Sequence, residues 1–132
     1  MVVRTYTDVD VAPETWVSVC RIKAIVPFTG IAALIGGEQV AIFRLASDSE
    51  CYAISNFDPF SQAYVLSRGL VGDKNGVVKV ASPIYKQNFD LKNGQCLDDA
   101  QIILPTWETQ VVEGIVQIRV RKLEESDNGF QA

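Results

Sequence analysis

Short apolar runs separated by turn-forming residues constrain the fold of this chain more than any other feature of its sequence. Residues 31–35 and 38–45 are two such runs, and Gly36-Gly37 separates them. Glycine adopts the positive φ angles that a two-residue turn between antiparallel strands needs, so this segment is typical of a β-hairpin. Repeated short strands joined by such turns predict an all-β fold, either a sandwich or a barrel.

Further strands are expected along the rest of the chain. They cover residues 16–20, 51–55, 77–81, 89–91, 95–97, 107–112 and 115–120, the last two forming a hairpin around Glu113-Gly114. In residues 115–120 apolar and polar side chains alternate, as expected of a half-buried strand. Residues 58–69 and 72–76 lack this alternation and are predicted to be loops, the first with room for a short helical turn.

The length and composition fit one folded domain. A chain of 132 residues with 48% apolar residues can bury a sizeable core, which excludes a disordered chain. We expect a single domain over residues 1–132, with its core at about 15–121 and a polar tail at 122–132. The mean hydropathy of +0.12 indicates a two-sheet core, a face that docks on a partner, or both.

The charge and the ends of the chain narrow the possible partners. A net charge of −4 argues against nucleic acid, because binding phosphates needs a concentrated basic surface. No apolar run approaches the length needed to cross a membrane, and the first residues lack a signal-peptide pattern. We therefore expect a cytoplasmic protein without a membrane or nucleic-acid partner.

The cysteines and tryptophans are expected in the core. Cys20, Cys51 and Cys96 are odd in number and widely spaced, which favours buried free thiols in a reducing compartment over disulfides or a zinc site. Cys96 closely follows the turn at 92–94 and is predicted to be the most exposed of the three. Trp16 and Trp107 are both predicted to be core residues.

No arrangement of residues in the sequence supports catalysis. The chain contains no histidine, the usual base that activates a serine or cysteine nucleophile. The adjacent carboxylates Asp98-Asp99 and Glu124-Glu125 are typical of a solvated surface. The sequence thus predicts no catalytic residue, no cofactor-binding residue and no metal ligand.

Two polar loops carry a resemblance to a known fold. Asn56-Phe57-Asp58 follows the strand at 51–55, and Ser82-Pro-Ile-Tyr85 precedes the segment 88–96, Asn-Phe-Asp-Leu-Lys-Asn-Gly-Gln-Cys. This order resembles the two cluster-binding loops of a Rieske domain, where Cys-x-His and Cys-x-x-His hold a [2Fe–2S] centre. The resemblance covers residues 16–120 and implies an antiparallel Rieske-like β-sandwich with a smaller loop-rich subdomain.

A more specific resemblance lies within that fold. Residues 56–69 and 82–91 resemble the small subunit of cytoplasmic NAD(P)H-dependent assimilatory nitrite reductase, whose cluster ligands are commonly absent. The resemblance implies a large-subunit partner that carries siroheme, an iron–sulfur cluster and FAD, and that reduces nitrite to ammonium. Asn88 departs from the histidine expected at that position of the family.

The resemblance places four polar residues at the ligand positions. They are Asn56 and Asp58 in the first loop and Ser82 and Tyr85 in the second. These side chains are poor substitutes for thiolate and imidazole around iron, and only Asp58 is charged at neutral pH. We expect a side-chain network instead, in which Asp58 accepts a hydrogen bond from Tyr85 or Ser82 and Asn56 ties the loop backbones together.

Aromatic and cationic residues near the loop tips are candidates for docking. Aromatic side chains and arginine are enriched in the cores of protein interfaces. The predicted docking residues are Phe60, Tyr64, Arg68 and Lys86, whereas Phe57 is expected to point inward. The alternative for Phe57 and Phe60 is that both fill the space left by a cluster.

These observations favour a non-redox small subunit that docks on the cofactor-bearing large subunit of a nitrite reductase and supports it. The chain is then part of an enzyme without holding catalytic residues of its own. Three alternatives remain: a stand-alone binding module on the same fold, an electron-transfer protein with unusual cluster ligands, and a relative of ring-hydroxylating ferredoxins.

Overall fold

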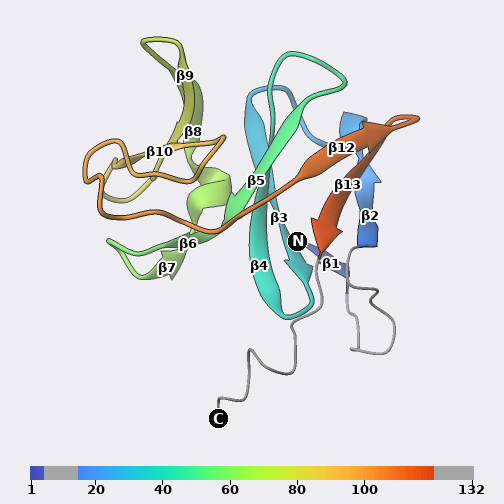
Figure 1. Ribbon diagram of the computed structural model, residues 1–132, viewed down its shortest axis with the longest axis horizontal. Coiled ribbons are helices and arrows are strands. Elements are labelled where there is room, and N and C mark those ends of the chain that lie inside the picture. The colour runs from blue at the N-terminus through green and yellow to red at the C-terminus, as the bar shows by residue number, and fades with distance from the viewer. Residues whose placement is uncertain (5–14, 121–132) are drawn as a thin grey trace.

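The computed structural model describes residues 1–4 and 15–120, and confirms an all-β fold. Apart from two short 3-10 turns, every described element is a strand (Figure 1). The predicted polar tail at 122–132 lies outside the described residues. In chain order the elements are β1 (Val2–Arg4), β2 (Thr15–Arg21), η2 (Ile22–Ala24), β3 (Thr29–Ile35), β4 (Glu38–Arg44), β5 (Cys51–Ser55), β6 (Phe57–Asp58), β7 (Ala63–Tyr64), η3 (Leu66–Arg68), β8 (Leu70–Lys74), β9 (Val77–Ala81), β10 (Asn88–Asp90), β11 (Thr106–Trp107), β12 (Thr109–Val112) and β13 (Ile115–Val120).

A five-stranded sheet in the order β1-β3-β4-β5-β11 forms the centre of the molecule (Figure 1). The predicted hairpin is its β3–β4 pair, and Gly36 and Gly37 take φ angles of 57° and 88° in the turn. Its strands pair antiparallel except β1, which lies parallel to β3 at the edge. The parallel edge strand was not expected, since the sequence predicts no strand before residue 15.

Both faces of this sheet are buried, which explains why Val40 to Phe43 are all apolar and fully enclosed. Successive side chains of a strand point to opposite faces. Val40 and Ile42 belong to one core cluster, whereas Ala41 and Phe43 belong to a second. The sheet therefore lies between two cores rather than facing water on one side.

A three-stranded sheet in the order β12-β13-β2 covers the first core. Val116 and Ile118 of β13 are fully buried in it, as the alternation predicts. The predicted strand at 107–112 is wrong in one respect, because it is divided between two sheets. Trp107 ends β11 and pairs with Ala53 in the five-stranded sheet, and Thr109 begins β12 in the other sheet.

A loop-rich subdomain covers the second core. It contains the β6–β7 hairpin, η3 and a three-stranded sheet in the order β10-β9-β8, which lie on the other side of the central strands in Figure 1. Leu66, Val80 and Phe89 are among its fully buried side chains, and they pack with Phe43 of β4. This arrangement matches the expected sandwich with a smaller subdomain.

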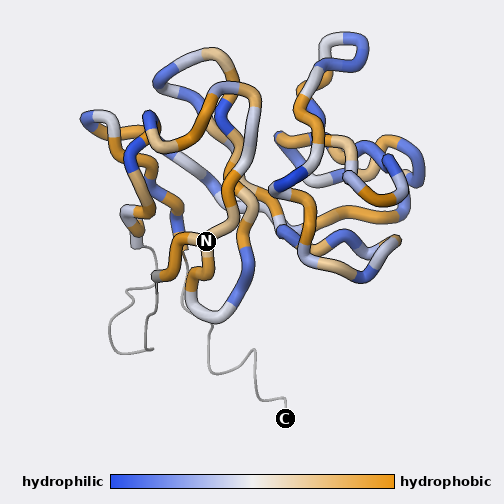
Figure 2. The backbone as a smooth tube through the Cα atoms, turned by 180° about the vertical axis from the view of Figure 1, so that it is seen from behind, coloured by the Kyte–Doolittle hydropathy of each residue, from blue (hydrophilic) through white to orange (hydrophobic). Residues whose placement is uncertain are grey.

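The hydropathy of the chain differs between the central strands and the loop ends. Figure 2 shows apolar segments along the central strands and hydrophilic colour at several loop ends. One such end is the β8–β9 turn, where the prediction of a loop at 72–76 is wrong. β8 continues to Lys74, and only Asn75 and Gly76 form the turn, with φ angles of 53° and 85°.

Two predictions about single residues, Cys96 and Trp16, are also wrong. Cys96 is 1% exposed, because its backbone pairs with Phe89 in an isolated β-bridge and its side chain packs in the second core. Cys20 is instead the most exposed of the three free cysteines. Trp16 is 40% exposed on β2, because its neighbours Val17 and Val19 are the residues that turn inward. Trp107 is half-buried against the first core.

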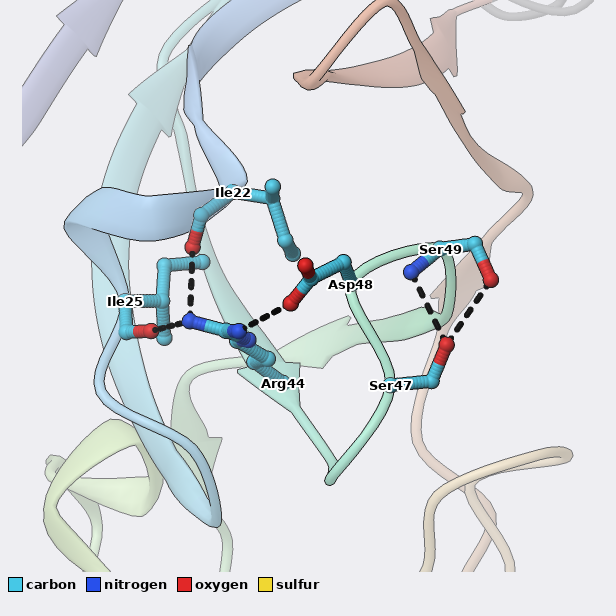
Figure 3. Close-up of polar contacts among 6 residues, drawn as sticks. All are labelled: Ile22, Ile25, Arg44, Ser47, Asp48 and Ser49. Atoms are coloured by element: carbon cyan, nitrogen blue, oxygen red, sulfur yellow. Dashed lines mark hydrogen bonds and ion pairs between the residues drawn. The ribbon is translucent and has the colours of Figure 1, made fainter.

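Arg44 is a buried cation that joins the turn after β2 to the central sheet (Figure 3). Its guanidinium Nη1 donates to the carbonyl oxygens of Ile25 at 2.8 Å and Ile22 at 3.4 Å, and Nη2 pairs with Asp48 at 2.5 Å. These carbonyls belong to the turn after β2, so Arg44 holds the end of one sheet against the other. The acceptors of Nη1 and Nη2 offset the cost of burying this charge, whereas Nε is buried without a hydrogen-bond partner among the described residues.

Candidate functional site at the two loops

Asn56 begins the first loop directly after β5 and is 1% exposed. Its Oδ1 accepts from the backbone N–H of Ser67 at 2.7 Å, and its Nδ2 donates to Oε1 of Gln39 at 3.0 Å. The Asn56 N–H also donates to the carbonyl of Gln39, and its carbonyl accepts from Leu66. Asn56 thus ties the first loop to β4 and η3. These bonds do not reach the second loop, so they differ from the expectation that Asn56 ties the two loop backbones together.

Asp58 is completely buried in the same loop. Its Oδ1 accepts from the backbone N–H of Phe60 at 2.9 Å and of Ser61 at 3.4 Å, and its Oδ2 accepts from the Ser61 hydroxyl at 2.9 Å. The carboxylate therefore organises the turn that connects β6 to β7. This is the local pattern that aspartate commonly forms with the residues two and three positions later.

Ser82 connects the two loops. Its hydroxyl donates to Oδ2 of Asp58 at 2.5 Å, and both side chains are fully buried. The backbone of Ser82 also closes its own loop, through its N–H to the Gln87 carbonyl and its carbonyl from the Lys86 N–H. One direct hydrogen bond thus joins two residues that correspond to ligand positions in the Rieske resemblance.

The pKa of Asp58 reflects this surrounding. Burial by itself would raise the pKa of the carboxyl, because it penalises the charged form. The hydrogen bonds from the Ser82 hydroxyl, from the Phe60 backbone and from Ser61 outweigh burial and hold the pKa below its ordinary value. Asp58 is therefore ionised at neutral pH, and its charge is satisfied by donors rather than by a cation.

Tyr85, at the fourth ligand position, is 60% exposed. Its hydroxyl makes no hydrogen bond with any residue that the structure describes, so of the two expected donors to Asp58 only Ser82 fills that role. Lys86 follows it with a φ of 68°, and its ammonium donates to the Pro83 carbonyl at 3.4 Å. The tip of the second loop thus presents Ile84, Tyr85 and Lys86 to solvent.

The predicted docking residues divide into two groups. Tyr64 and Arg68 are exposed on the first loop, as Lys86 is on the second. Phe60 instead packs against the second core, with its ring centroid 6.2 Å from that of Phe89. Phe57 is half-buried, with its ring 5.1 Å from that of Tyr64.

Three further residues of this site were not identified from the sequence. Gln39 and Ser67 bind the Asn56 side chain, and Ser61 binds Asp58. Only Ser61 carried a local signal, because it lies three residues after Asp58. Asn88 anchors the end of the second loop, where its backbone N–H donates to Oδ2 of Asp98 at 2.7 Å.

The described residues contain no group of three or more histidine, cysteine, aspartate or glutamate side chains placed to hold a metal ion. None of the helices described in residues 1–4 and 15–120 is long and apolar enough to cross a membrane.

Comparison with known proteins agrees with this fold. Residues 15–119 match the model of the family described as the Rieske-like [2Fe-2S] domain. The chain belongs to this family of Rieske-like domains. A solved structure of a protein named as a NADH-dependent nitrite reductase small subunit, from Mycobacterium tuberculosis, superposes with a TM-score of 0.78. It is 41% identical, over 83% of this chain and 98% of that one.

Sequence comparison narrows the class. A protein of Salmonella typhimurium named nitrite reductase (NADH) small subunit is 48% identical over 104 residues, 79% of this chain and 96% of the relative. Within the Rieske-like domains, this chain therefore belongs to the nitrite reductase small-subunit family. A nitrite reductase [NAD(P)H] large subunit of Klebsiella oxytoca also matches, at 38% identity over 82% of this chain and only 11% of its own length.

Proposed function

We propose that this chain is the non-redox small subunit of a cytoplasmic NAD(P)H-dependent nitrite reductase, and that it acts by docking on the cofactor-bearing large subunit and supporting it. The observation that carries this proposal is the buried hydrogen bond between Ser82 and Asp58. It joins the two loops directly, at positions where the resemblance would place cluster ligands. The loops keep their arrangement through protein atoms alone.

The donor set does not suit an iron–sulfur cluster. Such clusters bind thiolate sulfur and imidazole nitrogen, whereas these positions offer an amide, a carboxylate, a hydroxyl and a phenol. The polar atoms of Asn56 and Asp58 are already engaged with Gln39, Ser67, Phe60, Ser61 and Ser82. We therefore propose no metal or cofactor in this chain, and no electron path through it.

The Klebsiella relative supports the docking role. A segment similar to this chain forms a minor part of a protein named as a large subunit. Covalent attachment places such a domain permanently beside the rest of that chain, at a high effective concentration. A separate chain of the same family reaches an equivalent position only by binding. In the proposed complex the siroheme, the iron–sulfur cluster and the FAD belong to the large subunit.

The proposal is tested by measuring nitrite-dependent NADH and NADPH oxidation by the purified large subunit, with and without this chain. We expect this chain to increase activity, or the half-life of activity, and to bind in a pull-down. The purified chain should be colourless above 350 nm, since a [2Fe–2S] centre absorbs visible light. A coloured, iron-containing protein would favour the electron-transfer alternative, and the absence of binding and of any effect would favour a stand-alone module.

A further inference from the structure

A cavity of about 340 Å³ lies beside the first loop, where η3 and β7 approach the central sheet. It is distinct from the buried contact between Asp58 and Ser82, neither of which lines it. Two of the predicted docking residues, Tyr64 and Arg68, do line it. Its other walls include Gln39 of β4, Asn56, Ser67, and the small residues Gly30 and Ala32 of β3.

The sequence of β3 allows η3 to form one wall of this cavity. A Cβ atom on Gly30 would lie 2.6 Å from the Phe43 ring and 2.9 Å from the Ser67 carbonyl, closer than real Cβ atoms come. Glycine therefore lets η3 pack against β3, as Figure 1 shows near the middle of the molecule. The bond from Asn56 Oδ1 to the Ser67 N–H fixes the position of Ser67 and Arg68.

The lining is rich in donors and includes the Arg68 guanidinium, and Met1, which carries the N-terminal ammonium, also belongs to it. Arg68 is exposed, and its guanidinium makes no ion pair or hydrogen bond with any residue that the structure describes. The hydroxyls of Tyr64 and Ser67 also have no hydrogen-bond partner in residues 1–4 and 15–120. No aspartate or glutamate is among the described residues that line the cavity, although the whole chain has a net charge of −4. Such a set of donors suits a carboxylate oxygen pair, which arginine binds with two parallel bonds.

We infer that this cavity receives an acidic side chain of the large subunit, with Arg68 as its ion-pair partner and Tyr64 at its rim. This inference rests on the proposed function and names the recognition chemistry of its docking surface. A free small anion would gain little here, because an exposed guanidinium pairs only weakly in water. When the carboxylate belongs to a docked protein, the protein excludes water from around the ion pair and so strengthens it. Tyr64 at the rim would add aromatic contact area of the kind that is common at the centre of protein interfaces.

The test measures the affinity of the full chain for its large subunit by calorimetry at low and high salt. We expect Arg68→Gln to weaken binding by about tenfold to a hundredfold, the cost of a lost charge-assisted hydrogen bond. Arg68→Lys should lose less, because it keeps the charge but not the two-pronged geometry. Ala32→Leu should also weaken binding, since it fills the cavity without changing any charge.

The matched control is Lys74→Gln, which removes an exposed cation of β8 that does not line the cavity. It should bind as the wild-type chain does. Binding of Arg68→Gln with wild-type affinity and salt dependence would overturn the inference and leave the proposed function intact. A wild-type chain that fails to bind would instead contradict the proposed function, and the inference with it.

A second measurement tests whether the cavity binds a free small anion instead of an acidic side chain of the large subunit. The isolated chain is titrated with sodium nitrite and with sodium acetate while the backbone amide signals of Ser67 and Arg68 are followed by NMR. We expect no saturable shift below about 10 mM, because an exposed guanidinium pairs only weakly with a free anion in water. A saturable shift below 1 mM, lost in Arg68→Gln, would assign the cavity to a free anion and overturn the inferred partner side chain.

Discussion

The loop of residues 56–68 and the loop of residues 82–87 meet at one buried contact, but they are held in different ways. The first loop is braced by its own residues and by the central sheet, through the side chains of Asn56 and Asp58. The second loop is closed by backbone bonds of Ser82, and the Ser82 hydroxyl is its side-chain link to the first. The buried side chains of Asn56 and Asp58 in the first loop are thus structural, while Tyr85 in the second loop is exposed.

This difference shows how protein groups alone can connect two loops. A metal would hold both loops equally, through ligands from each. Here a carboxylate placed in the first loop collects donors from both, so the first loop can keep its shape without the second. The second loop is closed by its own backbone bonds and depends on the first only for the buried acceptor of its Ser82 hydroxyl, while its tip is exposed.

Because Asp58 collects donors from both loops, Asp58→Ala should have the largest effect on the stability of the protein. This change leaves the Ser82 and Ser61 hydroxyls and two backbone N–H groups without their shared acceptor. We expect a loss of roughly 3 kcal/mol in the free energy of unfolding, since several buried donors lose their partner at once. Urea unfolding followed by tryptophan fluorescence measures it, with Asp99→Ala as a control on an exposed carboxylate. Equal effects of the two variants would contradict the assigned role of Asp58.

A smaller effect is expected for Ser82→Ala, which breaks the connection but leaves Asp58 its bonds within the first loop. The free energy of unfolding should fall by about 1–2 kcal/mol. In a double-mutant cycle Asp58→Ala and Ser82→Ala should couple by about 1 kcal/mol or more, because they share one bond. Additive effects would mean that the two loops are held together by something else.

The acid dependence of stability provides a third measurement. The pKa of Asp58 is lowered in the folded protein, so its contribution is fully present above the ordinary carboxyl pKa of about 4 and is lost as pH falls through the lower folded value. Between these values the unfolded chain binds more protons, so stability falls with decreasing pH. Asp58→Asn should flatten this fall relative to wild type in unfolding experiments from pH 6 to pH 2. If the free energy of unfolding of Asp58→Asn fell with decreasing pH as steeply as that of the wild type, Asp58 would not contribute to the acid dependence of stability.

The smallest effect is expected for Tyr85→Phe. The Tyr85 hydroxyl binds none of the described residues, so the free energy of unfolding should change by less than about 0.5 kcal/mol. The variant should also show no coupling to Asp58→Ala in a double-mutant cycle. A clear coupling would place Tyr85 in the network with Asp58 and would weaken the contrast between the two loops.

Much of the fold could be predicted from local sequence patterns. Gly36-Gly37 predicted a hairpin, and the alternation after Ile115 predicted a strand with Val116 and Ile118 inside, because these signals depend on residues near one another. The errors occurred where the partner of a segment decides its structure. Trp107 joins a different sheet from Thr109, and Cys96 is buried by the second core rather than exposed by its turn.

The site shows the same division between sequence and tertiary structure. The sequence alone determined the donor types at the loop positions and excluded histidine from every one of them. It could not determine that Ser82, rather than Tyr85, reaches Asp58 across 24 residues, or that Asn56 binds Gln39 and Ser67. A hydrogen bond requires its two atoms within about 3 Å, and for residues far apart in the chain only the packing of the two cores sets that distance.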